Sequence, residues 1–320
     1  MTRSSPERLP EFETVGCLFS HAAPAELLFE RPDWWFELPG NFAWRRCPEC
    51  GLLLLSPRPT QTKIIDYYLS NYAAYRPAIA DEKWPLMRWK RRRNLRGVMS
   101  AVNQHAAVGQ LLDVGCATGN YLAEMQKGGW EVQGVELQSD AAVYAQQRFG
   151  FTVFNGDLLD SQLPAQSFDV VTLWDVLEHT FDPLAILKET ARILRPGGLV
   201  AFSIPDPTSV WAERFGPTWI GYDAPRHLYL FHGQSLDLLL NRAGFHLVVA
   251  NHYLATYHTW AASFHTWLNQ KMPPGTTRKF MRKMTYLPFW APLTNPYFNW
   301  LNRRGRGSVL TVVAKLGTEL

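Results

Sequence analysis

From residue 110 onward, short apolar runs alternate with segments of helical periodicity. The apolar runs have the length of buried strands and are bounded by polar or glycine-rich turns. They cover 110–115, 131–136, 151–154, 168–174, 198–204 and 245–250. The amphipathic helices expected between them cover 120–127, 140–149, 183–194 and 234–243. Strands that alternate with helices predict a doubly wound, Rossmann-like α/β fold with a mostly parallel sheet covered on both faces.

The pattern divides the chain into five parts. Residues 1–60 hold three of the four cysteines and few periodic segments, and residues 61–107 form a helical connector to the α/β core at 108–250. The tail 308–320 is rich in β-branched residues and predicts a last strand, which would make the sheet seven-stranded. Residues 251–307 would then be a helical insertion ahead of that strand.

Composition narrows the class of protein. The chain has 320 residues, of which 47% are hydrophobic and 19% charged, and this excludes disordered and fibrous proteins. Four cysteines are too few for a disulfide scaffold. The N-terminus lacks the apolar core of a secretory signal, and no run approaches the roughly 18 apolar residues of a membrane span. A cytoplasmic location is therefore expected.

The formal net charge of +4 is unevenly distributed. Residues 251–307 contain eight basic and no acidic residues, which leaves −4 on the rest of the chain. Aromatic residues recur in this insertion at helical spacing, namely Tyr253, Tyr257, Trp260, Phe264 and Trp267. Rings flanked by cations are typical of surfaces that contact anionic membranes or lipophilic substrates. A lid over the core is the alternative, and nucleic acid is disfavoured because no RNA-binding fold accompanies the basic residues.

The sharpest local signal is the loop Gly115-Cys116-Ala117-Thr118-Gly119 after the first strand of the core. Glycines there let the backbone approach a ligand, and the following helix offers free N–H groups. The spacing differs from the G-x-G-x-x-G of dinucleotide sites. Asp113, at the strand end, would repel a pyrophosphate but suits an amino group or a sulfonium. This loop therefore disfavours a dinucleotide.

Two further acids follow the next strands. Glu136 ends the second strand, where an acid can accept both hydroxyls of a ribose. Asp157 follows the third strand and could hydrogen-bond an adenine amino group. Each acid alone would be interpreted as a solvated loop residue. Three acids in order behind a glycine loop instead rim the crevice in which a doubly wound sheet binds its ligand.

The glycine loop and the segments that carry Glu136 and Asp157 resemble the ordered motifs of class I S-adenosylmethionine-dependent methyltransferases. The same resemblance extends to FDVVTLWDVLEH at 168–179 and ARILRPGGLV at 191–200. The LEH segment and PRHLYLF at 225–231 are similar to the subgroup that includes ubiquinone-type O-methyltransferases. Cys116 departs from the family pattern, in which glycine is more usual. The resemblance covers roughly residues 108–250.

The resemblance assigns roles around the cofactor. It implies that Asp113, Gly115 and Gly119 surround the methionine end of S-adenosylmethionine, that Glu136 holds the ribose and that Asp157 holds the adenine edge. Leu137 would pack on the adenine. Leu158 and Trp174 complete the set of expected cofactor contacts.

Two histidines are candidates for a general base. Methyl transfer from a sulfonium depends mainly on orienting the acceptor, but an oxygen or carbon acceptor can also require a base near neutral pKa. His179 follows the fourth strand, and His227 lies in the loop after the fifth. Either could instead only fix its loop by hydrogen bonding. The expected acceptor is a small, lipophilic molecule.

Two other functions stay open at this stage. One is a non-catalytic scaffold that retains the cofactor fold. The other is an RNA methyltransferase, which is disfavoured because Trp174 and Asp175 stand where such enzymes carry a Pro-Pro-Tyr or Pro-Pro-Phe motif. The oligomeric state is not indicated by the sequence.

The cysteines near the N-terminus have the spacing of a zinc site. Cys47-Pro48-Glu49-Cys50 places two thiolates on a tight turn, and Cys17 and His21 could complete a Cys₃His set. Because a lone CxxC is a weak signal, simple packing of these cysteines is the alternative. The arrangement is similar to methyltransferases with an N-terminal zinc-binding region, in which the zinc would be structural.

Overall fold

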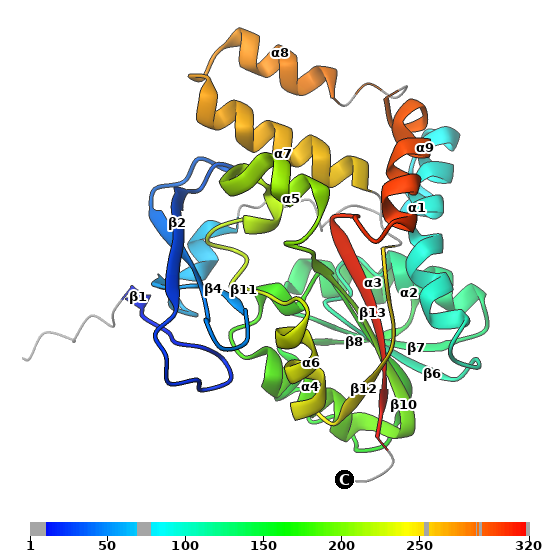
Figure 1. Cartoon of the computed structure of the whole chain (residues 1–320). Coiled ribbons are helices and arrows are strands. Elements are labelled where there is room, and N and C mark those ends of the chain that lie inside the picture. Colours follow the sequence, from blue (N-terminus) through cyan, green and yellow to red (C-terminus); the bar gives the residue numbers. More distant parts are fainter. Residues whose placement is uncertain (1–10, 69–77, 253–255, 286, 288–289, 318–320) are drawn as a thin grey trace, which may run out of the picture.

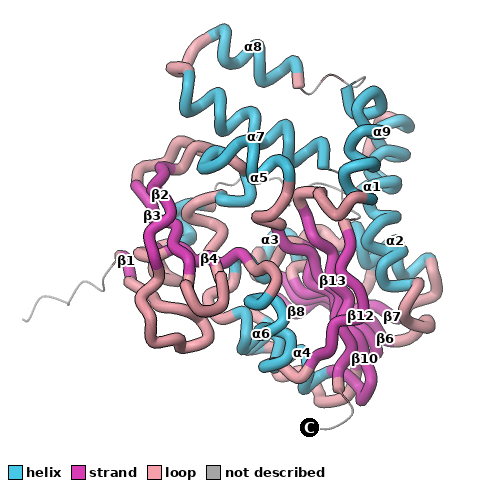
Figure 2. Tube along the Cα trace, in the orientation of Figure 1, coloured by secondary structure: helices cyan, strands magenta, loops and turns pink. Residues whose placement is uncertain are grey.

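The computed structural model describes residues 11–68, 78–252, 256–285, 287 and 290–317. A seven-stranded sheet occupies its centre, in the strand order β12-β13-β10-β9-β6-β7-β8 (Figures 1 and 2). The strands are β6 (Gln110–Val114), β7 (Glu131–Glu136), β8 (Thr152–Asn155), β9 (Phe168–Trp174), β10 (Leu194–Pro205), β12 (Phe245–Asn251) and β13 (Val309–Leu316). Strands β6 to β10 pair in parallel, whereas β13 runs antiparallel to both β10 and β12. The predicted mostly parallel, Rossmann-like sheet is confirmed.

Helices cover both faces of this sheet because successive strand residues point to opposite sides. Leu111 and Val170 share a buried cluster with α1, α2 and α3, whereas Leu112 and Val171 share another with α4 and α6. These helices are α1 (Pro85–Asn103), α2 (Asn120–Lys127), α3 (Ser139–Phe149), α4 (Pro183–Ile193) and α6 (Gln234–Arg242), and α5 (Val210–Phe215) follows β10. Short 3₁₀ helices are η1 (Ile64–Tyr67), η2 (Ile79–Asp81), η3 (Leu158–Asp160), η4 (Leu177–His179), η5 (Gly216–Thr218) and η6 (Ile220–Tyr222).

The N-terminal residues form a second sheet beside the core, in the order β11-β4-β3-β2. Its strands are β2 (Glu26–Pro32), β3 (Asn41–Arg46), β4 (Leu53–Leu55) and β11 (Tyr229–Leu230), and β1 (Phe12–Glu13) pairs separately with β5 (Arg58–Pro59). The sequence did not indicate that β11, from the segment predicted as core, would complete this sheet. Trp44 of β3 also belongs to the same buried cluster as Leu173 of β9. The N-terminal part is therefore packed continuously with the core.

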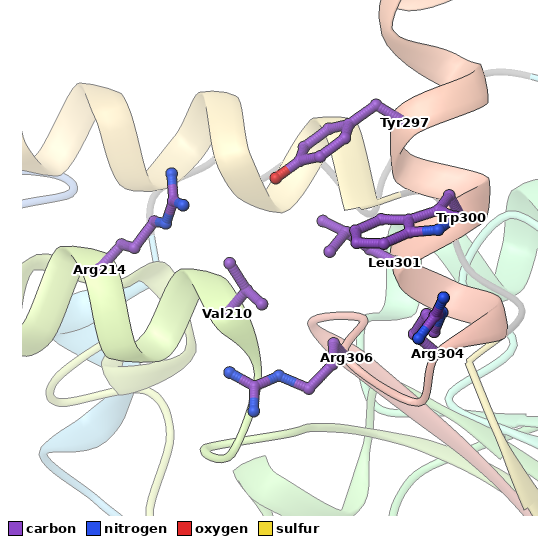
Figure 3. Close-up of a pocket in the computed structure, with 7 residues that line it drawn as sticks. All are labelled: Val210, Arg214, Tyr297, Trp300, Leu301, Arg304 and Arg306. Atoms are coloured by element: carbon purple, nitrogen blue, oxygen red, sulfur yellow. The ribbon is translucent and has the colours of Figure 1, made fainter.

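The insertion between β12 and β13 contains α7 (Thr256–Lys271), α8 (Thr276–Met284) and α9 (Trp290–Arg303) (Figure 1). Of the predicted aromatic face, Tyr253 lies outside the described residues. Tyr257 and Trp260 turn inward, since Tyr257 packs on Phe298 at 5.8 Å between ring centroids and Trp260 lies 6.4 Å from Trp211 of α5, whereas Trp267 is 37% exposed. A cavity of 550 Å³ opens between α5 and α9 (Figure 3). Among the described residues, no helix has both the length and the apolarity to cross a membrane.

Candidate functional site

The glycine loop lies at the carboxyl end of β6, where the sheet meets α2. Gly115 and Gly119 adopt φ values of 74° and 75°, which favour glycine. A Cβ added at Gly115 would meet Val176 Cγ2 at 2.7 Å, and one at Gly119 would meet the Phe151 ring at 2.6 Å. The loop is therefore pressed between the segment after β9 and the end of α3, and only residues without a side chain fit at these two positions.

Glu136 ties the glycine loop to the end of β7. One carboxylate oxygen accepts a hydrogen bond from the Ala117 N–H at 2.8 Å, and the other accepts from the Gln138 N–H at 2.8 Å. Burial raises the pKa of this carboxyl even though those N–H groups favour its charged form. Glu136 therefore lies buried where the sequence placed the acceptor of the ribose hydroxyls, and it also fixes the loop.

Asp113 lies on the neighbouring strand, almost fully buried. Its register partner on β9 is Thr172, whose hydroxyl donates to the Asp113 carboxylate at 2.6 Å. Burial raises the pKa of this carboxyl to about 8, and the nearby charge of Glu136 acts in the same direction. A buried acid that has no cationic partner in the described part of the chain is a group suited to bind an amino group.

The residues predicted to hold the adenine lie beyond β7 and β8. Asp157 caps η3, where its side chain accepts a hydrogen bond from the Leu159 N–H at 2.9 Å. Leu158 is buried beneath the crevice edge, whereas Leu137 is 68% exposed directly after Glu136. An exposed leucine beside a ribose-binding acid offers an apolar face on which a flat base can pack.

Trp174 ends β9, and its neighbour Tyr121 is a residue that the sequence analysis missed. The two rings meet edge to face with centroids 5.6 Å apart. Both Trp174 Nε1 and the Tyr121 hydroxyl are buried without a hydrogen bond of normal geometry among the described residues. Buried polar groups normally have partners, so these two atoms fit a crevice built to surround a polar ligand such as S-adenosylmethionine.

The two candidate bases face each other, with ring centroids 4.6 Å apart and an interplanar angle of 78°. His179 Nδ1 donates to the Arg226 carbonyl at 3.0 Å, and His227 Nδ1 donates to the Gly221 carbonyl at 2.8 Å. The carbonyls can only accept, so each ring keeps its lone pair on Nε2. Burial lowers the pKa of both, that of His179 to about 3. Both imidazoles are thus neutral near pH 7 with an unprotonated Nε2, and the stronger shift makes His179 a weak base.

Two further groups surround this histidine pair. The Tyr68 hydroxyl lies 3.0 Å from His179 Nδ1. The Glu178 carboxyl is fully buried, and burial together with the charge of Asp175 raises its pKa well above the usual range. Ligand atoms of Glu178, His179 and His227 lie within 4.8 Å of one another, so these residues could also hold a metal ion. Glu178 belongs to the LEH segment, but nothing in the sequence distinguished it from a surface acid.

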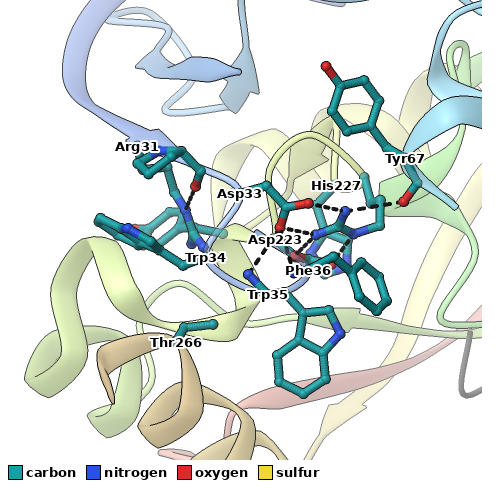
Figure 4. Close-up of polar contacts among 12 residues, drawn as sticks. Arg31, Asp33, Trp34, Trp35, Phe36, Tyr67, Asp223, His227 and Thr266 are labelled. Carbon is teal, nitrogen blue, oxygen red and sulfur yellow. Dashed lines mark hydrogen bonds and ion pairs between the residues drawn. The ribbon is translucent and has the colours of Figure 1, made fainter. Parts of the chain in front are cut away.

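A buried ion network supports the loop that carries His227 (Figure 4). Arg226 makes paired hydrogen bonds to Asp33 at 2.7 and 2.8 Å and to Asp223 at 2.6 and 2.8 Å. Arg31 is also fully buried, and its Nη1 donates to the carbonyls of Pro217 and Trp219. The formal charges of the two arginines, Arg31 and Arg226, balance those of the two aspartates, Asp33 and Asp223. The network connects the end of β2 to the carbonyl that orients His179.

The four predicted metal ligands also come together. The Cys17 and Cys50 sulfurs are 3.7 Å apart, and His21 Nδ1 lies 3.3 Å from the Cys47 sulfur. All four ligand atoms lie within 4.8 Å of one another. Thiolates bound 2.3 Å from a tetrahedral zinc are about 3.8 Å apart. The cluster therefore fits a structural zinc ion in both its donor set and its size.

Comparison with protein families identifies this architecture. Residues 86–250 match the family described as "Methyltransferase domain". The chain belongs to this methyltransferase family. The predictions of a class I S-adenosylmethionine-dependent methyltransferase and of S-adenosylmethionine as its cofactor are thereby confirmed. The family match includes the glycine loop, the three acids and both histidines.

Curated relatives share part of this region. A ubiquinone biosynthesis O-methyltransferase of Idiomarina loihiensis is 38% identical over 101 residues, which are 29% of this chain and 41% of the relative. A probable S-adenosylmethionine-dependent methyltransferase of Mycolicibacterium smegmatis is 28% identical over 173 residues, 53% of this chain and 62% of the relative. The methyltransferase chain thus spans about two fifths of the length of the ubiquinone-type relatives that it matches.

Solved structures are similar at low identity. A methyltransferase of Thermotoga maritima, described as a possible histamine N-methyltransferase, is 17% identical with a TM-score of 0.47, covering 79% of this chain and 96% of its own. A methyltransferase of Archaeoglobus fulgidus is 20% identical with a TM-score of 0.46, covering 73% and 100%.

Proposed function

We propose that this methyltransferase transfers the methyl group of S-adenosylmethionine to an oxygen of a small, lipophilic acceptor. The observation that carries the proposal is the pair of facing histidines, His179 and His227, each held through Nδ1 by a backbone carbonyl so that its Nε2 is unprotonated. They follow the segment that borders the cofactor loop, because Val176 lies against Gly115. The relatives named as ubiquinone biosynthesis O-methyltransferases support an oxygen acceptor of this kind.

In this proposal the histidines hold and move one proton. S-adenosylmethionine supplies an electrophilic methyl group whose carbon–sulfur electron pair stays on sulfur when the bond breaks. Nε2 of His227 or His179 would accept the proton of the acceptor hydroxyl when the acceptor oxygen is methylated. Asp113 and Glu136 bind the amino and ribose groups, while Asp157, Leu137, Leu158 and Trp174 surround the adenosine.

The test is an acceptor screen with methyl-labelled cofactor, beginning with catechols and other phenols that carry apolar chains. Replacing His227 with glutamine should reduce kcat about 100-fold, as expected for loss of a general base. His246→Gln, an exposed histidine on β12, is the matched control. Full activity of both His179→Gln and His227→Gln would reject the base. Cofactor binding without transfer to any acceptor would instead favour the scaffold, and transfer to RNA would favour the RNA methyltransferase.

Cofactor affinity should rise with pH up to about 8. The Asp113 carboxyl, with its pKa raised to about 8 by burial, must lose its proton before it pairs with the amino group of the ligand. Affinity for S-adenosylhomocysteine should therefore fall by up to about tenfold for each pH unit below 8 and level off above it. Calorimetric titration between pH 6 and 9 measures this. The profile should be flat with 5′-methylthioadenosine, which lacks the amino acid, and a slope retained in Asp113→Asn would contradict the assignment.

We also propose that Cys17, His21, Cys47 and Cys50 bind one structural zinc ion. The support is the convergence of four donors from two segments on a space of zinc size. With four protein ligands the coordination sphere is closed, so the ion would stabilise the N-terminal sheet without taking part in chemistry.

Cys47→Ser should abolish zinc binding, because three remaining ligands do not close the site. Metal analysis should find about one zinc per wild-type chain and almost none in the variant. The melting temperature should fall by more than about 5 °C, since each kcal/mol shifts it by about 2–4 °C in a chain of this size. Cys116→Ser, which changes a buried thiol outside the cluster, should keep its zinc. Zinc retained by Cys47→Ser would rule this site out.

Finally, we propose that the insertion contacts an anionic membrane surface. The support is its content of eight basic and no acidic residues, combined with exposed apolar side chains on α8 and α9. Such surfaces bind where cations meet anionic headgroups and apolar side chains enter the boundary below them. Flotation with vesicles that contain phosphatidylglycerol, compared with vesicles of phosphatidylcholine alone, tests the contact.

A further inference from the structure

A cavity opens between α5 and α9 (Figure 3), and none of the residues that line it belongs to the cofactor crevice. Val210 of α5 and Leu301 of α9 contribute apolar side chains, and Tyr297 and Trp300 contribute aromatic rings. Three arginines complete the lining, and Figure 3 shows Arg214 on α5 opposite Arg304 and Arg306 beyond the end of α9. The cavity is therefore apolar and aromatic on the inside with cations from both sides.

Aromatic stacking positions these cations. The Arg304 guanidinium lies 5.3 Å from the centre of the Trp300 ring, and the Arg214 guanidinium lies 5.6 Å from that of Trp211. Stacking uses the face of the guanidinium and leaves its edge N–H groups for oxygen acceptors. Among the described residues, no carboxylate lies within ion-pair distance of Arg214 or Arg304, whereas Arg306 pairs with Glu213 at 2.7 Å. Two of the three cations thus lack an anion.

An exposed apolar stripe continues from the cavity along α9. Leu293, Tyr297 and Trp300 are 67%, 42% and 50% exposed, and their spacing of four and three residues places them on one side of the helix. Tyr297 and Trp300 stack on each other with centroids 6.1 Å apart. The opposite side of α9 is buried through Phe298 and Leu301. If α9 only closed over the core, its large apolar side chains would be expected to pack against protein and not to face water.

We propose that this cavity binds anionic phospholipid headgroups, with Arg214 on one side and Arg304 on the other each donating to phosphate oxygens. The inference rests on the proposed membrane contact, and it identifies the lipid headgroup as the part of the membrane that the cavity binds. Guanidinium groups match the geometry of phosphate oxygens. The stripe of Leu293, Tyr297 and Trp300 would then enter the boundary between headgroups and acyl chains. Phosphate is the shared chemistry of a lipid headgroup and a free anion, and the apolar stripe favours the lipid.

The experiment compares two double variants in full-length protein. Arg214→Gln/Arg304→Gln removes the two cations of the cavity, and Lys279→Gln/Lys283→Gln removes two exposed cations of α8 outside it. Partition is measured onto vesicles of phosphatidylcholine with and without phosphatidylglycerol. Calorimetry then measures binding of dihexanoyl phosphatidylglycerol below its micelle concentration, and of inorganic phosphate. Near-ultraviolet circular dichroism and S-adenosylhomocysteine binding establish that each variant is folded.

The proposal expects saturable binding of the short-chain lipid, weakened at least tenfold in the arginine variant and unchanged in the lysine variant. Removal of any two cations at a membrane surface can lower partition onto anionic vesicles by up to about thirtyfold, and the arginine variant should lose clearly more than the lysine variant because it also removes the headgroup site. Equal losses of partition in both variants would overturn the cavity while leaving the membrane contact intact. Tight binding of inorganic phosphate alone would overturn the lipid as occupant. No vesicle binding by wild type would reject the proposed membrane contact, and the short-chain lipid would then decide the cavity separately.

Discussion

Replacing Glu136 with alanine should weaken binding of S-adenosylhomocysteine by about two to four orders of magnitude. Each hydrogen bond from a ribose hydroxyl to a carboxylate contributes roughly 1.5–3 kcal/mol, and the substitution removes two of them. It also removes the acceptor of the Ala117 N–H, which holds the glycine loop against β7. Both losses act on the ligand-binding crevice, so the loss of affinity should exceed any loss of stability.

Calorimetric titration measures this effect, and the same strand supplies a control. Glu131 begins β7 and is exposed, so Glu131→Ala removes an equal charge far from the crevice and should leave the affinity within about twofold. Zinc content and thermal unfolding establish that both variants are folded. An affinity for Glu136→Ala within about fivefold of wild type would exclude Glu136 as the ribose acceptor, whatever its role in the loop.

The crevice could be predicted from sequence because its determinants are local. A glycine loop follows a strand, and Asp113 and Glu136 each occupy the end of a strand whose length and apolar pattern are visible in the sequence. In a parallel sheet the carboxyl ends of neighbouring strands meet at one edge, so sequence order alone indicates proximity. The same reasoning located the last strand beyond the insertion, because its β-branched pattern is continuous.

The environment of the histidines could not be predicted, because it depends on pairs of residues far apart in the chain. Asp33 and Arg226 are separated by 193 positions, and charged residues are normally expected at the surface. Tyr121 lies one position inside α2, and nothing in the sequence distinguishes it from an ordinary core aromatic, although its buried hydroxyl makes no hydrogen bond of normal geometry among the described residues. In the insertion the periodicity identified helices but not their orientation. Tyr257 and Trp260 of α7 pack inward while Trp267 is 37% exposed, and the longer exposed stripe belongs to α9.

Replacing Asp33 with asparagine should destabilise the fold by about 3–5 kcal/mol, the cost of removing one partner from a buried ion pair. Asparagine keeps the shape of the side chain but not its charge. Arg226 would keep Asp223 as a partner, but the four buried groups would then carry a net positive charge. The substitution would also destabilise the charged form of Arg31. Burial already lowers the pKa of Arg31 to about 10, and the negative charge of Asp33 opposes that shift. The melting temperature should fall by roughly 10 °C in a chain of this size.

Glu213→Gln provides the contrast, since it breaks the ion pair with Arg306, in which both side chains are largely exposed. Exposed pairs contribute about 0–1 kcal/mol, so its melting temperature should change by no more than about 2 °C. Because the Arg226 carbonyl accepts the His179 Nδ1 hydrogen, Asp33→Asn should also lower methyl transfer at temperatures where the protein remains folded. Equal stability of Asp33→Asn and Glu213→Gln would show that the buried ion pair between Asp33 and Arg226 contributes no more to stability than an exposed pair. The N-terminal sheet would then contribute to the histidine site through packing alone.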